Sequence, residues 1–150
     1  MNENAIVFSF NDTEKIILSL EKSLEYLDSC DWADIILVQK DQHILLSNDS
    51  IYYNINRFND FLQKVLLNKL PLDTSDINNS GYLWESYSSG KSCMTWLYND
   101  KNGTIIFEVT PEESHFIKKI ATETAQEWLQ QTHYIIQKIE NNIERWEKIK

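Results

Sequence analysis

The sequence is poor in glycine, proline and cysteine, and it has no long hydrophobic run. With 3 Gly and 2 Pro among 150 residues, it lacks the composition of a disordered or low-complexity chain. Cys30 and Cys93 are too few for a disulfide framework and have apolar or aromatic neighbours, so we expect two reduced thiols in the core. Apolar runs such as residues 35–38 are far shorter than the roughly 20 residues that cross a bilayer, and residues 1–10 lack the pattern of a signal peptide.

The chain also lacks an excess of positive charge. It carries 14 Lys and Arg against 23 Asp and Glu, a formal net charge of -9. Affinity for nucleic acids comes largely from basic side chains that neutralise phosphates, so this balance argues against DNA or RNA as a ligand. We therefore expect no nucleic-acid partner, no membrane partner and a cytoplasmic location. A basic protein is the expected partner.

Local signatures of enzyme sites are absent as well. The sequence has no HExxH, CxxC, GxSxG or Glu-x-Lys motif, and three isolated glycines cannot build a phosphate-binding loop. The histidines His43, His115 and His133 are too far apart in sequence to share a helix face within one turn, which favours structural or solvated roles. We expect no catalytic residue, no metal ligand and no cofactor. An enzyme with a nonlocal site, using Glu85 or Glu108 with a histidine, stays open as an alternative.

Hydrophobic periodicity predicts the elements of the first half of the chain. Apolar side chains from Ile16 to Leu27 keep the three-and-four spacing of one buried helix face, and residues 11–14 precede them as a capping segment. Two short apolar runs separated by a polar turn are typical of a hairpin. The expected elements are a strand at residues 6–10, a helix over residues 14–27, a hairpin from residues 35–38 and 44–46, and a helix over residues 56–68 that ends before Pro71.

The second half predicts a three-stranded antiparallel meander followed by a long helix. Residues 82–109 contain three segments rich in aromatic and β-branched side chains, separated by two polar turns. Residues 110–113 (TPEE) have the pattern of a helix start, and apolar side chains at helical spacing continue to the chain end. The polar residues 130–132 allow a bend or two helices there. We therefore expect one α+β domain, residues 1–150, in which an antiparallel sheet packs against two or three helices.

Negative charge is concentrated in the first part of the chain. Residues 1–80 carry 13 acidic and 6 basic residues, so -7 of the net charge of -9 lies there. Two compact acidic turns stand out, one around Trp32 and one in the loop over residues 70–80. Turns favour Asp for backbone reasons alone, but such turns are also suited to docking a basic protein. The candidate partner-binding residues are Asp28, Asp31, Trp32, Asp34, Asp73 and Asp76.

The aromatic residues of the meander allow two roles. Alternation puts Tyr82 and Trp84 on one face of the first strand, and Trp96 and Tyr98 on one face of the second strand. We expect most of these rings to be core, because aromatic side chains bury large areas and a sheet needs a covered face. Any exposed ring is a candidate interface anchor or a platform for a sugar or a base.

The C-terminal half of the chain carries a resemblance to a known group of proteins. Residues 96–100 (WLYND) are followed by residues 103–111 (GTIIFEVTP) and by a helix that contains tryptophan. In this pattern, the chain resembles immunity proteins of bacterial contact-dependent growth inhibition and related polymorphic toxin systems. The resemblance implies a small acidic antidote without catalytic residues. Its partner would be the C-terminal domain of a secreted toxin, commonly a nuclease, which it neutralises by blocking the active site or an adjacent surface.

One other binding function fits the composition. Type III secretion chaperones are also small, acidic α+β proteins, and they would dimerise and bind an unfolded segment of an effector. The immunity hypothesis instead allows a monomer with a folded partner. We therefore expect a monomer rather than a dimer.

Overall fold

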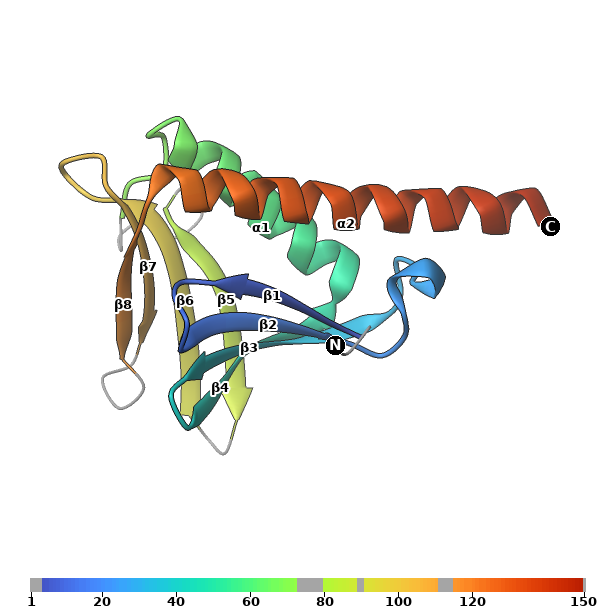
Figure 1. Cartoon of the computed structure of the whole chain (residues 1–150), viewed down its shortest axis with the longest axis horizontal. Coiled ribbons are helices and arrows are strands. Elements are labelled where there is room, and N and C mark those ends of the chain that lie inside the picture. Colours follow the sequence, from blue (N-terminus) through green and yellow to red (C-terminus); the bar gives the residue numbers. More distant parts are fainter. Residues whose placement is uncertain (1–3, 73–79, 89–90, 111–114, 150) are drawn as a thin grey trace.

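The computed structural model describes residues 4–72, 80–88, 91–110 and 115–149. Within these residues the chain forms two four-stranded antiparallel sheets, two α-helices and one short 3-10 helix (Figure 1). The α+β class predicted from the sequence is confirmed, with a long helix at the C-terminus. The difference is that the strands form two sheets and not one.

Each sheet is a meander of consecutive strands. Sheet A contains β1 to β4 in chain order, sheet B contains β5 to β8, and α1 connects the two sheets. The strands are β1 (Ala5–Ser9), β2 (Glu14–Leu20), β3 (Trp32–Gln39), β4 (Gln42–Ser50), β5 (Tyr82–Ser88), β6 (Lys91–Asn99), β7 (Ile105–Thr110) and β8 (Phe116–Ile120). The helices are η1 (Leu24–Tyr26), α1 (Ile51–Leu66) and α2 (Thr122–Ile149).

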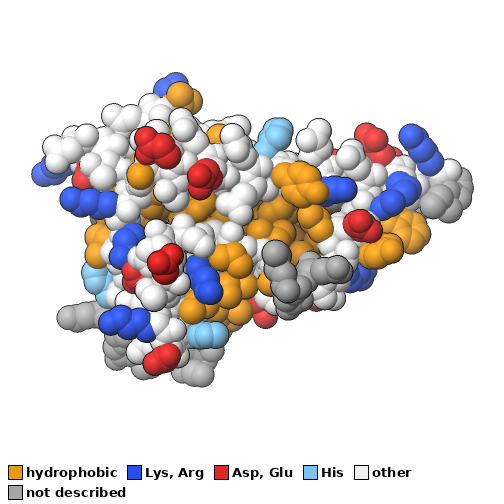
Figure 2. All heavy atoms as spheres, in the orientation of Figure 1, with side chains coloured by type: hydrophobic (Ala, Val, Ile, Leu, Met, Phe, Trp, Pro, Cys, Tyr) orange, Lys and Arg blue, Asp and Glu red, His pale blue; other side chains and the backbone are white. Residues whose placement is uncertain are grey.

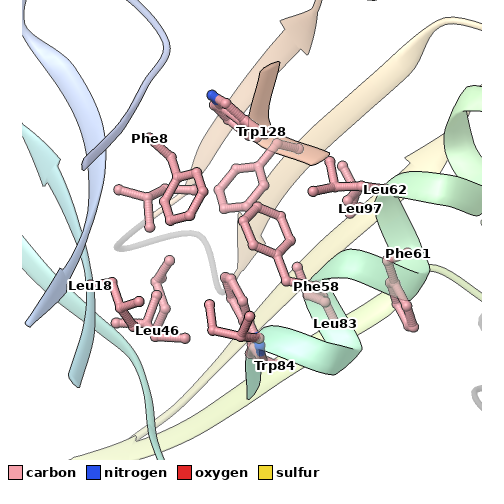
Figure 3. Close-up of a cluster of buried hydrophobic side chains, with 14 of the residues drawn as sticks. Phe8, Leu18, Leu46, Phe58, Phe61, Leu62, Leu83, Trp84, Leu97 and Trp128 are labelled. Atoms are coloured by element: carbon pink, nitrogen blue, oxygen red, sulfur yellow. The ribbon is translucent and has the colours of Figure 1, made fainter. Parts of the chain in front are cut away.

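The two helices and both sheets enclose one hydrophobic core. Phe58 of α1 lies at its centre, with ring centroids 5.3 Å from Phe8, 5.0 Å from Trp84 and 5.9 Å from Trp128 (Figure 3). These four rings come from β1, α1, β5 and α2, so they join elements that are distant in sequence. Such tilted and edge-to-face ring pairs add to the stabilisation that burial of the rings provides.

The predicted helix over residues 14–27 is wrong. Residues 14–20 form β2, which pairs with β1 on one side and with β3 on the other. Ile16, Leu18 and Leu20 alternate into the core, whereas Ile17 points to the opposite face. The apolar positions fit both the spacing of a helix and the alternation of a strand. The segment forms a strand because it pairs with a neighbouring strand on each side. Only the three-residue η1 remains helical in this segment.

The predicted start of the C-terminal helix is also wrong. Of residues 110–113, Thr110 is the last residue of β7, and the others lie outside the described residues. Residues 116–120 form the additional strand β8, with Phe116 and Ile120 buried. The helix begins at Thr122 and runs without a break through residues 130–132.

A buried polar contact explains why the polar segment does not interrupt α2. Thr132 is fully buried, and its hydroxyl donates to Asn59 of α1 at 2.9 Å. Because this polar side chain has a hydrogen-bond partner inside the molecule, it can occupy the packed face of the helix.

The hairpin, the meander and the helix before Pro71 are confirmed. The hairpin is β3 and β4, and the meander is β5 to β7. Helix α1 begins earlier than predicted, because the Ser50 hydroxyl caps it by accepting the N–H of Tyr53 at 3.4 Å. It ends before Asn68, which has a φ of 55°, a conformation that Asn tolerates after a helix.

Helix α2 packs on α1, passes beside β1 and extends over the segment that contains η1 (Figure 1). Asn142 of α2 is buried, and its side-chain amide donates to the carbonyls of Leu24 and Leu27, each at 2.9 Å. Among the described residues, neither α-helix is apolar enough to cross a membrane.

Candidate protein-binding face

The first acidic turn lies where the segment before β3 meets the start of α1. Asp31 is 8% exposed, and its carboxylate accepts the N–H of Asp28 at 2.8 Å and lies 3.1 Å from the Lys22 ammonium. Its backbone carbonyl accepts the N–H of Ile51 at 2.8 Å. The Asp31 carboxylate raises the pKa of Lys22 by hydrogen bonding and by its charge. The Asp31 carboxylate therefore holds the turn together, and its backbone carbonyl fastens the turn to α1.

Asp28 and Asp34 are more accessible than Asp31. One Asp28 carboxylate oxygen accepts the N–H of Cys30 at 2.7 Å, a local bond that shapes the turn. One Asp34 carboxylate oxygen accepts the side-chain amide of Asn48 on β4. Each carboxylate is thus held in place and keeps capacity for further hydrogen bonds.

Trp32 is the exposed aromatic residue of this turn. It is the first residue of β3, pairs with Ser50 and is 48% exposed. Because Trp32 and Asp34 are two residues apart on one strand, they lie on the same face of sheet A. A shallow pocket of about 160 Å³ lies beside them. Its lining residues are Ser19, Leu20, Glu21, Trp32, Ala33, Asp34 and Asn48.

An apolar row crosses the same outer face of sheet A. We call it the sheet A row; it consists of Val7, Ile17, Ile36 and Leu45, which are cross-strand neighbours on β1 to β4. Val7 is 40% exposed and the other three are half-buried. Figure 2 shows hydrophobic side chains gathered over these strands. An apolar patch of this kind is typical of interaction surfaces.

Sequence reasoning missed the sheet A row for a specific reason. Ile17 was expected on the buried face of a helix, and Ile36 was expected in a covered strand. The available signal was the alternation of Ile16, Leu18 and Leu20, which leaves Ile17 on the other face of a strand.

The second acidic turn belongs to a part of the chain that the structure does not describe. Asp73 and Asp76 lie outside the described residues. The structure therefore brings together Asp28, Asp31, Trp32 and Asp34 of the predicted set, with Glu21 as an additional acid beside them.

The aromatic residues of sheet B differ in part from the expected alternation. The register shifts between Tyr82 and Trp84, so Trp84 is buried in the core while Tyr82 lies on the outer face with Trp96 and Tyr98. The shared face expected for Tyr82 and Trp84 is wrong because this irregularity breaks the period of two. Tyr87 is 73% exposed, whereas the other rings of the meander are buried or half-buried.

Hydrogen bonds to carboxylates order this outer aromatic cluster. The Tyr82 hydroxyl donates to Glu85 at 2.6 Å and the Tyr98 hydroxyl donates to Glu108 at 2.7 Å. Burial, and then the neighbouring carboxylate, raises the pKa of each of these tyrosines. Both therefore keep their protons well above neutral pH.

One histidine meets one of the carboxylates named for the enzyme alternative. His115 Nε2 lies 3.0 Å from Glu108 Oε2, and the side chains are 42% and 20% exposed. His43 and His133 are exposed on other elements. Nowhere in the described part of the chain do three His, Cys, Asp or Glu side chains cluster as metal ligands would.

The two cysteines are unpaired and differ in environment. Cys93 is half-buried, and burial raises the pKa of its thiol. Cys30 is exposed in the acidic turn, so its expected place in the core is wrong. The aspartates around it shape a surface turn, and its apolar neighbour in sequence, Trp32, points to solvent as well.

Comparisons with known proteins give no assignment: no family model, no curated protein and no solved structure matches the chain.

Proposed function

We propose that the chain is an immunity protein that binds and neutralises a secreted toxin domain, most simply a basic nuclease. The single observation that carries the proposal is the exposed Trp32, which is held on a strand end between carboxylates, with the sheet A row further along the same face beyond Asp34. This combination is suited to a folded basic protein. The composition, with a net charge of -9 and no local catalytic motif, is in line with it.

The physical chemistry of the face favours tight and fast binding. Tryptophan is enriched among the residues that dominate interface energies, particularly where surrounding contacts exclude water. Trp32 begins a strand within a sheet, so little conformational freedom is lost when a partner covers it. Asp28, Asp34 and Glu21 supply negative charge around the ring, which accelerates encounter with a basic surface.

Neutralisation would follow because this face attracts the same basic side chains that a nuclease uses to bind its substrate. A nuclease approaches phosphates with Lys and Arg side chains. An acidic face that pairs with those side chains competes with the nucleic acid for the same surface. A standard interface of roughly 1,600 Å² in total would cover the acidic turn together with the sheet A row.

The test is a charge reversal on the face with a matched reversal elsewhere. With a captured toxin domain as the partner, the double variant D28K/D34K should weaken binding by at least roughly tenfold and reduce its salt dependence. Asp31 is left intact because it fastens the turn. The double variant E144K/E147K, at two exposed residues of α2, changes the net charge by the same amount as D28K/D34K and should leave the affinity nearly unchanged.

A truncation of the ring separates the aromatic contribution from the charge. Trp32→Ala should weaken the same complex by roughly 2 kcal/mol or more if the ring is a central anchor. Tyr134→Ala, at a similarly exposed aromatic residue on α2, serves as the control. Equal affinities for the parent chain, D28K/D34K and W32A would place the toxin-binding face elsewhere.

A further inference from the structure

The free edge of β1 has unpaired backbone groups. In the β1–β2 ladder, Leu20 donates to Asn4 and Phe10 donates to Glu14, so the even-numbered residues of β1 bond to β2. The backbone groups of Ala5, Val7 and Ser9 therefore point away from the sheet. The one hydrogen bond that reaches them in the described structure comes from Gln131 of α2, whose side-chain amide donates to the Val7 carbonyl at 2.9 Å.

The other sheet edges are covered or charged within the described residues. Arg57 donates to the carbonyls of Tyr82 and Leu83 at the edge strand β5. The Ser86 hydroxyl donates to the Leu45 carbonyl at β4. Edge strand β8 carries the adjacent Lys118 and Lys119, and lysines discourage strand pairing. β1 has the sequence AIVFS without a charged residue, so its edge is the least protected.

A pocket of about 570 Å³ lies between this edge and α2. It is lined by Val7 and Ser9 from β1 and by Glu127, Trp128, Gln130, Gln131 and Tyr134 from α2. Tyr134 is 57% exposed, and Figure 3 shows the indole nitrogen of Trp128 on the side of the ring away from Phe58. Trp128 itself is buried, so the apolar surface that the pocket offers beside the unpaired backbone groups comes from Tyr134 and Val7.

We propose that β1 binds an extended segment of another protein by strand addition. The added strand would pair with Ala5, Val7 and Ser9, and one of its N–H groups would replace Gln131 on the Val7 carbonyl. Its side chains on one face would lengthen the sheet A row beyond Val7, and those directed to α2 would lie over the exposed ring of Tyr134. The inference concerns a different surface from the acidic turn and holds for a partner of any activity.

Two features select the occupant. α2 runs alongside the free edge (Figure 1), and the pocket of about 570 Å³ between them suits a single extended chain better than the sheet of a second copy. Among the described residues that line the pocket, Glu127 alone is charged. The fitting segment therefore alternates apolar side chains and carries one basic side chain toward Glu127.

A phage-displayed library of random linear peptides, selected on the full chain, tests this inference. Selected peptides should alternate apolar residues and contain Lys or Arg. A synthetic copy of one of them should slow amide hydrogen exchange at Val7. Two versions of this peptide are then N-methylated, one at its odd-numbered and one at its even-numbered amides. One version should lose binding and the other should keep it, because alternate amides of a strand face its neighbour.

Matched variants locate the site. Val7→Lys should weaken peptide binding by at least about tenfold, since a lysine on an edge strand opposes pairing. Ile117→Lys, at an exposed residue of β8, should not. Gln131→Ala should strengthen binding because it removes the group that occupies the Val7 carbonyl. W32A should leave it unchanged, which separates this site from the acidic turn around Trp32.

Three results would each overturn the inference. The first is a library that yields no binder. The second is a binder that tolerates N-methylation in both versions or that Val7→Lys does not affect. The third is a chain that is dimeric in solution with its Val7 amide already protected, because a second copy would then hold the edge.

Discussion

Asp31 differs from Asp28 and Asp34 in what its carboxylate does. It is buried, accepts the N–H of Asp28 and pairs with Lys22, whereas the other two remain partly accessible. The sequence pattern of closely spaced aspartates does not distinguish these roles. The distinction depends on how the turn folds back, which places the Asp31 carboxylate against the Asp28 N–H and the Lys22 ammonium.

Removal of the Asp31 carboxylate should destabilise the fold. Asp31→Ala leaves the N–H of Asp28 without its acceptor, and loss of a buried hydrogen-bonded group costs about 1–3 kcal/mol. Urea unfolding measures the difference, with Asp41→Ala in an exposed hairpin turn as the control. Equal midpoints for the two variants would contradict a stabilising role for the Asp31 carboxylate.

The pair Glu14 and Lys118 links sheet A to sheet B and should make stability depend on acid. The two charges lie 2.7 Å apart, and the hydrogen bond from Lys118 lowers the pKa of Glu14 below its ordinary value of 4.5. A lowered carboxyl pKa stabilises the fold above the unfolded value, and this contribution disappears as pH falls through the folded value.

Lys118→Met should therefore lower the thermal stability above about pH 5 and change it little at the acid end, where Glu14 is protonated in both proteins. The comparison is a series of melting curves from neutral to acid pH. Lys119→Met, on the adjacent exposed residue of β8, should leave the pH dependence of the parent chain intact. A pH profile that Lys118→Met and Lys119→Met alter alike would show that the Glu14 contact is not the cause.

Strands that are flanked by polar turns could be predicted from the sequence. Strands whose sequence or flanking segment also fits a helix could not. The hairpin of β3 and β4 and the meander of β5 to β7 have polar turns and rich β-branched or aromatic content. β2 has apolar residues at both helical and alternating spacing, and its partners on two sides settle the outcome. β8 follows a segment with the pattern of a helix cap, so the sequence predicts a helix where this strand lies.

Helix α2 should control the order of the segment that leads to the acidic turn. Asn142→Ala removes two hydrogen bonds to the carbonyls of Leu24 and Leu27, and the unsatisfied carbonyls should cost about 1–3 kcal/mol. Hydrogen exchange should accelerate over residues 24–31 more than in sheet B. Asn141→Ala, at the exposed neighbour, is the control. A uniform acceleration would contradict a local role for Asn142.

At the scale of the whole molecule, the sequence predicts the net charge and therefore the sign of the charge on a partner. The geometry of the binding face could not be predicted from it. Composition suffices for the net charge of -9 and its concentration before residue 80. The meeting of Trp32, Asp34 and the sheet A row depends on the registers of four strands. A register is fixed by packing between neighbouring strands, and the residue pattern of a single strand does not determine it.

Charge at this scale also gives a prediction for binding kinetics. Association with a basic partner should slow as ionic strength rises, because salt screens the attraction between the two surfaces. Dissociation should change less. Stopped-flow or surface-based kinetics at several salt concentrations measure both rates. An association rate that is independent of salt would argue against an acidic binding face.

The most direct test of the proposed function is capture and rescue. The chain is immobilised, exposed at physiological salt to a lysate of the strain that encodes it, and the bound protein is identified and expressed alone. We predict the C-terminal domain of a large secreted protein that is toxic when expressed alone and harmless when co-expressed with this chain, but not with its D28K/D34K variant. A captured protein without toxicity, or toxicity that the chain does not suppress, would contradict the proposal.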